Sequence, residues 1–261
     1  MYFRIVWQIF GFPRWKPIGI MNALRNAVSA NLRHGAGDVR QWLVVHQVGI
    51  FMQPIHNAGK IERLKVKDMD LLEMMKKSRS IRKYQQKQIP RTDLDKIVEA
   101  GLHAPNAGGG QRSRIVAIHN ANLTGKIGKL NMMSFDRDKL LGSHVSDEQP
   151  SVIDDPKIKN GFYDAPTVCI IFAQEDFLFS VADAFCIAEN MVLEAFSLGI
   201  DSCIVSRAEE TFTTDYGKQL LQDWKVPETM IARCFVVLGY HEGLYPKKKP
   251  RKENRSLIVE C

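Results

Sequence analysis

The chain has 261 residues, of which 45% are hydrophobic, and a formal net charge of +7. A chain of this length can bury a substantial core and fits one large domain, or one domain with an extension. Residues 1–66 hold nine Lys or Arg and two acids, so this segment carries the whole excess of positive charge. Residues 67–261 are therefore formally neutral. Because a fold that binds nucleic acid carries positive charge on its main body, we expect no nucleic-acid partner.

The five cysteines form no C-x-x-C pair, and their odd number argues against a disulfide framework. A reducing, cytoplasmic location is therefore expected. The seven histidines show no paired ligand spacing, which predicts no metal site.

Residues 1–67 differ from the rest, because their apolar clusters follow neither a helical nor an alternating period. The run Gln41–Ile55 is too short and too polar to span a bilayer, and Arg14 and Lys16 interrupt the apolar core that a signal peptide needs. We expect a poorly ordered N-terminal extension over residues 1–67, a functional domain over residues 68–261, and no membrane partner. A less favoured alternative is a basic tail that tethers the protein to nucleic acid or an acidic membrane.

From Asp68 onward the pattern predicts helices and strands that alternate along the chain. Thr92 is the candidate N-cap of the second helix, and Gly199 ends the predicted helix Asp183–Leu198. The predicted elements are a helix Leu71–Lys77, a helix from Thr92 to Leu102, a strand Arg114–His119, helical pieces joined by a mobile loop over residues 120–160, a strand Thr167–Ala173 buried on both faces, a helix Asp183–Leu198, a strand Ser202–Val205, a helix around Tyr216–Trp224, a strand Ala232–Gly239 and a β-rich end Ser256–Val259. This order indicates an α/β or α+β protein.

The helix Asp183–Leu198 is apolar on nearly all sides. Such a helix needs cover all round, which predicts a central position in the core or burial against a second subunit.

Two stretches indicate ligand binding. In Arg79-Ser80-Ile81-Arg82, two guanidinium groups and a hydroxyl can hold a phosphate monoester. The alternative is a solvated basic end of the helix Leu71–Lys77, because cations are favoured at the negative C-terminal end of a helix dipole. In the loop Ala104–Gln111, three successive glycines allow a flat ligand to approach the backbone, and Asn106 and Gln111 offer amide groups.

Several further motifs share an order along the chain: Asp164-Ala165-Pro166, Asn190–Ile200, Ser202-Cys203-Ile204, Val226-Pro227 and Val236–Tyr240. Together with Arg79–Arg82 and Ala104–Gln111, this order resembles the FMN-dependent nitroreductase family, over roughly Met69 to Glu260.

The resemblance implies an α+β fold with a mixed sheet sandwiched by helices, and a homodimer with two FMN sites at the subunit interface. It implies an oxidoreductase that takes hydride from NADH or NADPH and passes electrons to a small-molecule acceptor, such as a nitroaromatic or a quinone, in a ping-pong cycle. No side chain needs to act as catalytic acid, base or nucleophile.

The resemblance also implies the residues that bind the cofactor. Arg79 and Ser80 would bind the FMN phosphate, and Arg82 would lie near the pyrimidine edge of the flavin ring. Arg251 or Lys252 would return to the phosphate from the C-terminal tail, with Arg255 also in reach. The remaining residues would line the ring and the ribityl chain: Pro105, Asn106 and Gln111 from the glycine loop, and Ile204, Val205 and Ser206 from the other side.

The glycine loop departs from the family pattern. It reads Gly109-Gly110-Gln111-Arg112-Ser113 where the family usually has Asn-Ser-Gln-Pro-Trp. This change keeps open an alternative in which the same fold carries out reductive dehalogenation or flavin breakdown.

Overall fold

A computed structural model describes residues 69–260 apart from 134 and 137–143. The extension that the sequence predicts over residues 1–67 lies outside the described residues, as does part of the loop predicted after residue 120. The described helices are α4 (Leu71–Lys77), α5 (Arg91–Leu102), α6 (Ala121–Met133), α7 (Ser180–Ser197) and α8 (Asp215–Asp223), with short 3₁₀ turns η2 (Ala107–Gly109) and η4 (Glu209–Phe212). The strands are β1 (Ser113–Ile118), β2 (Thr167–Gln174), β3 (Asp201–Val205) and β4 (Met230–Gly239).

The four strands form one sheet in the order β1-β2-β4-β3. All three pairings between neighbouring strands are antiparallel, and the β2–β4 register shifts between Ile171 and Phe172. A parallel pairing occurs at the isolated bridge between Ser80 and Ser202, beside β3. The α+β class is therefore confirmed, with the sheet antiparallel throughout its named strands.

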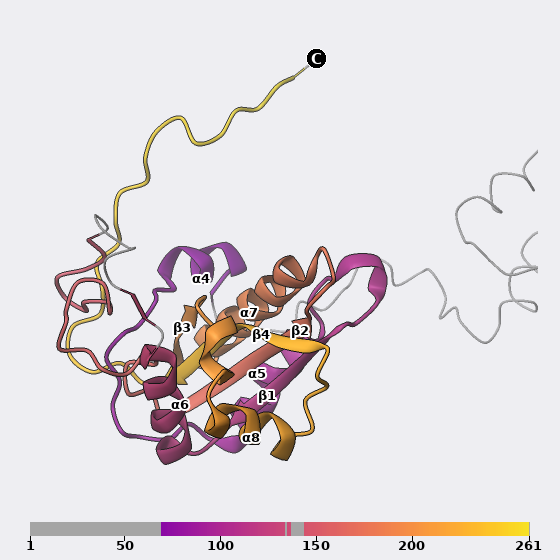
Figure 1. The fold of residues 1–261 in the computed structure, drawn as a ribbon. Coiled ribbons are helices and arrows are strands. Elements are labelled where there is room, and N and C mark those ends of the chain that lie inside the picture. The colour runs from indigo at the N-terminus through magenta and orange to yellow at the C-terminus, as the bar shows by residue number, and fades with distance from the viewer. Residues whose placement is uncertain (1–68, 134, 137–143, 261) are drawn as a thin grey trace, which may run out of the picture. The chain divides into compact units, whose positions relative to one another are not determined.

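The two faces of the sheet carry separate hydrophobic layers, and helices cover the sheet on both faces (Figure 1). Side chains alternate along a strand, so Cys169 and Ile171 of β2 pack toward α5 and α7, whereas Ile170 and Phe172 pack toward α6, η4 and α8. Every residue of β2 from Thr167 to Ala173 is buried, which confirms the prediction of a strand covered on both faces.

Helix α5 begins earlier than the sequence suggested. Pro90 is the N-cap, and its carbonyl accepts hydrogen bonds from the backbone N–H groups of Asp93 and Leu94, at 3.1 Å each. The prediction of Thr92 as N-cap is wrong, because Pro90 already has the extended backbone of a cap and Thr92 lies inside the first turn.

Helix α7 packs one side on the sheet and on α5 through Ala184, Ala188, Met191 and Ala195, which are all fully buried. Its opposite side is open: Val181 is 48% exposed and Cys186 is exposed. Gly199 adopts a φ of 71° directly after the helix, which confirms it as the residue that ends α7. A single chain thus covers only part of the apolar surface of α7.

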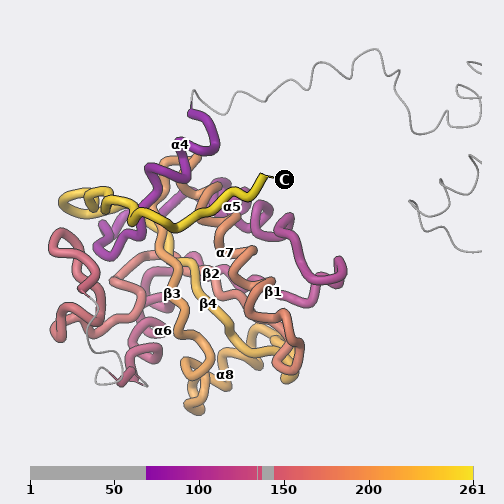
Figure 2. The backbone as a smooth tube through the Cα atoms, turned by 90° about the horizontal axis from the view of Figure 1, so that it is seen from above, coloured from indigo at the N-terminus to yellow at the C-terminus, as the bar shows by residue number. Residues whose placement is uncertain are grey.

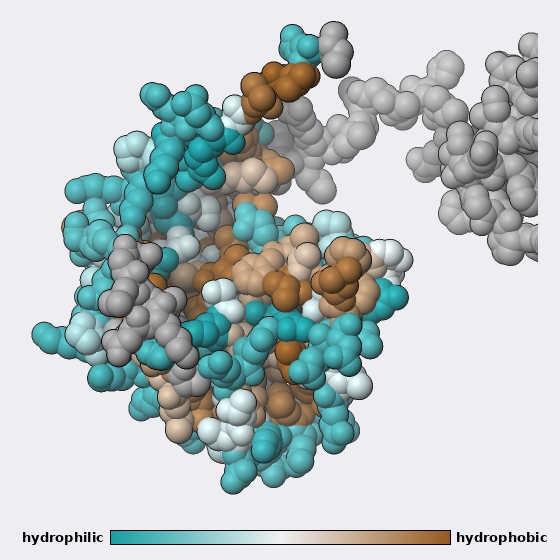
Figure 3. Space-filling view, turned by 45° about the horizontal axis from the view of Figure 1, so that its top comes forward, coloured by the Kyte–Doolittle hydropathy of each residue, from teal (hydrophilic) through white to brown (hydrophobic). Residues whose placement is uncertain are grey.

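The C-terminal tail leaves the folded body as an irregular segment, which Figure 2 shows in yellow. The prediction of a β-rich end at Ser256–Val259 is wrong for this chain, because these residues form no strand. Leu257, Ile258 and Val259 are between 76% and 86% exposed, and Figure 3 shows hydrophobic side chains near the end of the tail, clear of the body. A β-rich sequence needs a neighbouring strand for its backbone groups.

Across the part of the chain that the structure describes, no helix combines the length and the hydropathy needed to cross a membrane.

Candidate active site

The basic stretch after α4 runs beside β3. The Ile81 N–H donates to the Ser202 carbonyl at 2.9 Å, next to the Ser80–Ser202 bridge. Ile81 is fully buried, and because side chains alternate along an extended segment, Ser80 and Arg82 lie on its other side. The fold therefore directs Ser80, a predicted phosphate ligand, and Arg82, predicted to lie at the flavin ring, away from the core.

Gln149 fixes this stretch from a distant part of the chain. Its Oε1 accepts a hydrogen bond from the Arg82 backbone N–H at 2.8 Å, and its Nε2 donates to the Leu244 carbonyl at 3.1 Å. The side chain is buried, with 1% of its surface exposed. One amide thus joins the basic stretch to the segment that follows β4.

A cavity of about 570 Å³, called here the basic cavity, opens beside Arg79. It is lined by three segments: Ser78, Arg79, Ser80 and Arg82, residues 144–148, and residues 246–251 of the tail. Arg251 lies on this lining and Lys252 does not, which separates the two tail cations that the sequence left as alternatives. Arg79 also donates from Nη1 to the Lys76 carbonyl at 2.8 Å, so it binds the end of α4 as well as lining the cavity.

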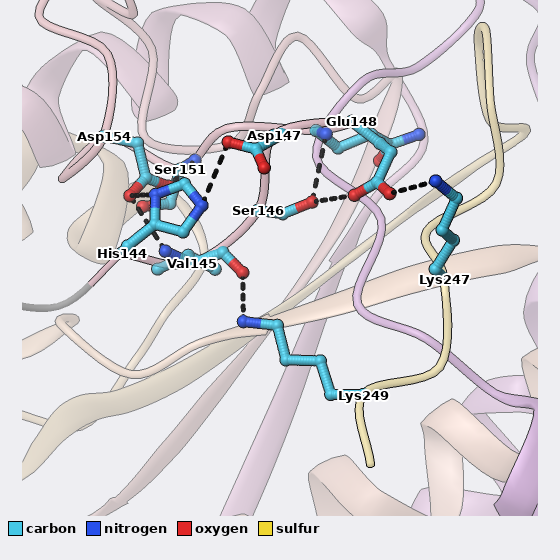
Figure 4. Close-up of polar contacts among 10 residues, drawn as sticks. His144, Val145, Ser146, Asp147, Glu148, Ser151, Asp154, Lys247 and Lys249 are labelled. Carbon is cyan, nitrogen blue, oxygen red and sulfur yellow. Dashed lines mark hydrogen bonds and ion pairs between the residues drawn. The ribbon is translucent and has the colours of Figure 1, made fainter.

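Two walls of the basic cavity hold each other, as Figure 4 shows. Lys249 Nζ donates to the Val145 carbonyl at 2.6 Å, and Lys247 Nζ lies 3.6 Å from a carboxylate oxygen of Glu148. These contacts pin the basic tail against residues 144–148.

Asp154 supports this loop from behind. Its two carboxylate oxygens accept hydrogen bonds from the backbone N–H groups of Val145 and Ser151, at 2.9 and 2.8 Å. Burial raises the pKa of Asp154, but the hydrogen bonds from Ser151 and Val145 outweigh it and the pKa lies below its usual value. His144 Nδ1 lies 3.6 Å from the same carboxylate and adds to this lowering.

A second cavity, of about 500 Å³ and called here the ring cavity, contains the predicted residues Ile204, Val205 and Ser206. Arg82 lines both cavities. Tyr163 also lines the ring cavity and has a left-handed backbone with a φ of 56°, a conformation uncommon outside glycine. Burial raises the pKa of the Cys203 thiol, although the Arg82 charge opposes it, so this cysteine stays neutral near pH 7.

The glycine loop lies elsewhere. The Ala107 N–H donates to Asp183 in the first turn of α7 at 2.9 Å, whereas Val192 and Leu193, farther along α7, line a third cavity together with Arg79 and Ser80. Nine residues of helix separate Asp183 from Val192, which is about 13 Å along the axis. Figures 1 and 2 both show the loop at the opposite end of α7 from α4.

Within one chain, the structure therefore does not bring Pro105, Asn106 and Gln111 together with the other predicted site residues. Asn106 instead organises its own loop, since its Oδ1 accepts a hydrogen bond from the Gln111 N–H at 2.9 Å.

Sequence reasoning missed Tyr163 and Arg207, which line the ring cavity, and Gln149, which fixes the backbone of Arg82. Arg207 directly follows the predicted Ser206, so its place after a buried strand was a usable signal. Gln149 and Tyr163 carried none, because they lie in the polar region between residues 120 and 165 that has no clear period.

Comparisons with known proteins find related chains. The model of the nitroreductase family matches residues 75–240. A relative from Methanothermobacter thermautotrophicus, named "Putative NADH dehydrogenase/NAD(P)H nitroreductase", is 27% identical over 187 residues, which cover 71% of this chain and 82% of that protein.

Solved structures show the same fold. A nitroreductase with bound FMN from Bacteroides fragilis NCTC 9343 is 28% identical with a TM-score of 0.62, and the match covers 74% of this chain and 100% of that one. A nitroreductase with bound FMN from Desulfitobacterium hafniense DCB-2 is 20% identical with a TM-score of 0.59, covering 73% and 100% of the two chains, a likeness of fold alone.

Proposed function

Because the chain belongs to the nitroreductase family, we propose that it is an FMN-dependent oxidoreductase that uses NADH or NADPH to reduce nitroaromatic, quinone or related small acceptors. When bound, FMN supplies the redox chemistry, accepting hydride from the nicotinamide and returning electrons to the acceptor in a ping-pong cycle. The residues of this chain bind, orient and shield the reactants. A cytoplasmic location is part of the same proposal.

The observation that carries the proposal is the meeting of Arg79, Ser80 and Arg251 at the basic cavity. Arginine forks and a short hydroxyl donor match the oxygens of a phosphate monoester. These groups come from residues more than 160 positions apart in the sequence, which the hydrogen bonds of Gln149 and Lys249 hold in place. The donor set therefore fits the phosphate of FMN.

Arg82 supports the placement of the flavin ring. It lies where the basic cavity meets the ring cavity, whose wall includes the apolar side chains of Ile204 and Val205. A fixed cation there would stabilise negative charge on a reduced ring. We assign Arg82 this electrostatic role and name no catalytic acid or base.

The separated glycine loop supports a homodimer as the active form. If a second copy packs on the open side of α7, it can supply Pro105, Asn106 and Gln111 to a site built on Arg79 and Arg82 of the first. Exposed Val181 and Cys186 on that side of α7 fit such an interface.

The function is tested by the absorption spectrum of purified protein, supplied with FMN, before and after anaerobic addition of NADH and then NADPH. We expect a flavin spectrum that bleaches with one or both nucleotides. A protein that cannot be loaded with FMN would contradict the proposal.

The dimer is tested by mixing the variants Arg79→Ala and Asn106→Ala with subunit exchange, at an FMN concentration that saturates wild type and leaves each variant alone inactive. A site shared between subunits leaves one intact site in each mixed dimer, so about a quarter of the wild-type activity should return, because half of the dimers are mixed. A site contained in one chain predicts no recovery.

A further inference from the structure

The proposed function leaves one cation of the ring cavity without a role. Arg207 follows β3 and lines this cavity together with Arg82. The guanidinium of Arg207 donates from Nη1 to the Asn131 carbonyl at 2.9 Å and from Nη2 to Asn131 Oδ1 at 3.0 Å. It also lies over the Phe135 ring, 4.1 Å from the ring centroid. Its orientation is thus fixed by the end of α6 and the residues after it.

Asn131 is itself immobilised. It is fully buried, and its Nδ2 donates to the Arg207 carbonyl and, at 3.0 Å, to the Thr211 hydroxyl. The two residues therefore bind each other through backbone and side chain, which holds the guanidinium in one place before any ligand arrives.

Among the described residues no carboxylate forms an ion pair with Arg207, although the charge of Glu210 acts to raise the pKa of its guanidinium. Burial lowers its pKa, yet arginine stays charged at all ordinary pH values. A half-buried charge without a direct counter-ion is unfavourable, and an anionic ligand would relieve it.

The rest of the ring cavity suits a flat apolar body. Besides the two arginines, its lining includes Phe135, Val152, Ile153 and Val205, and no Asp or Glu stands among its described lining residues. Its volume of about 500 Å³ lies within the usual range for small-molecule sites.

We propose that aromatic acceptors that carry a carboxylate bind in the ring cavity beside the flavin ring, with Arg207 receiving the carboxylate and the apolar side chains of Phe135, Val152 and Ile153 receiving the acceptor ring. This inference rests on the proposed function, which assigns Arg82 to the flavin and leaves Arg207 as the cation available to a substrate. It names the acceptor class: anionic nitroaromatic or quinoid acids rather than their neutral counterparts.

The test compares 4-nitrobenzoate with 4-nitrobenzamide, a neutral molecule of nearly the same shape, as acceptors for the FMN-loaded protein. We expect the KM for the carboxylate to be at least about tenfold lower, the usual effect of one hydrogen bond to a charged group. Arg207→Gln should abolish this preference. Arg91→Gln, which removes an exposed cation paired with Asp95 on α5, should retain it.

A binding measurement without turnover gives an independent readout. Calorimetry on the FMN-loaded wild-type protein should show benzoate binding at least about tenfold more tightly than benzamide. This comparison, like the wild-type KM ratio, decides the matter even if Arg207→Gln fails to fold.

The outcomes separate the two proposals. Reduction of both nitro compounds with equal KM values, or equal binding of benzoate and benzamide, overturns the carboxylate site and leaves the oxidoreductase function intact. Selective benzoate binding without reduction of either nitro compound supports the anion site and contradicts the proposed function. If Arg207→Gln raises the KM of NADH or NADPH and leaves that of 4-nitrobenzoate unchanged, Arg207 serves the electron donor and the inference is wrong.

Discussion

Gln149 and Arg82 lie 67 residues apart in the sequence and are joined by a hydrogen bond of 2.8 Å, from the Arg82 backbone N–H to the Gln149 Oε1. The same amide donates to the Leu244 carbonyl. The geometry of the predicted phosphate site thus depends on a buried side chain that needs to touch no phosphate itself.

We expect Gln149→Leu to weaken both the fold and FMN binding. The change removes the partner of the Arg82 N–H and of the Leu244 carbonyl in two part-buried hydrogen bonds, and an unsatisfied group costs up to about 1–3 kcal/mol when it is buried. Urea unfolding and FMN titration by fluorescence quenching measure the two effects. Gln219→Leu is the matched control, because Gln219 is exposed on α8 and its side chain donates to Asp223 of its own helix. An equal loss in both variants would contradict a special role for Gln149.

The two tail cations should differ in their effect on cofactor affinity. Arg251→Ala should weaken FMN by roughly 1.5–3 kcal/mol, the range for a hydrogen bond to a charged group, and Arg79→Ala should do the same. Lys252→Ala should have little effect, since Lys252 does not line the basic cavity. Titration with riboflavin, which lacks the phosphate, should show no difference among these variants. A uniform loss of riboflavin affinity would mean that the substitutions disturb the fold.

Arg82→Ala should make the bound flavin harder to reduce. Loss of a cation near the ring removes stabilisation from the reduced, more negative state, and a shift of about −30 mV corresponds to about 1.4 kcal/mol for a two-electron couple. Potentiometric titration of the FMN-loaded protein measures the shift. Lys83→Ala, at the neighbouring position, lines neither the basic nor the ring cavity and should leave the potential near the wild-type value.

Asp154 should make stability depend on pH in the acidic range. Its pKa is lowered in the folded protein, so its carboxylate contributes stability above its unfolded pKa of about 3.9, and this contribution disappears as pH falls through the lower folded pKa. Asp154→Asn should therefore be less stable than wild type at pH 7, and the difference should narrow below about pH 4. Urea unfolding at a series of pH values checks this. A constant difference between pH 7 and pH 3 would show that the charge is not responsible.

Two helix glycines should respond in opposite directions to alanine. A Cβ at Gly125 of α6 would meet no atom within 4 Å, so Gly125→Ala should stabilise the protein by about 1 kcal/mol through helix propensity. A Cβ at Gly217 of α8 would lie 2.7–2.9 Å from the backbone of Phe212, which cannot rotate away. Gly217→Ala should destabilise by about 1–3 kcal/mol, as overpacking does. Thermal and urea unfolding compare the two, and stabilisation by both would show that the Phe212 turn moves aside.

Local patterns predicted the elements well, and the family resemblance is confirmed. The apolar run of β2 and the helical spacing of apolar residues in α7 each indicate that the element is buried. Both elements were therefore predicted close to their observed bounds. The start of α5 was missed because capping at Pro90 depends on backbone conformation rather than on a side-chain signature. The prediction of a β-rich end at Leu257–Val259 failed for a different reason. β propensity applies to a segment that pairs with a neighbouring strand, and here these side chains are exposed.

The candidate site was predictable only where its residues are neighbours in sequence. Arg79, Ser80 and Arg82 were predicted together because they form one continuous stretch of the sequence. Gln149 joins them through a contact across the fold, and the choice between Arg251 and Lys252 depends on the path of the tail along residues 144–148. Neither leaves a periodic or compositional signal in a single sequence.

The pairing of Ser80 and Ile81 with Ser202 has a consequence for solubility. Strand β3 is the last strand on its side of the sheet, and its outer backbone groups would otherwise offer a template for strands of other molecules. The segment that carries the predicted phosphate ligands also covers this edge of the sheet. Substitutions that detach this segment from β3 would therefore cause aggregation as well as a loss of cofactor affinity. Selection for solubility and selection for flavin binding would then act on the same few residues.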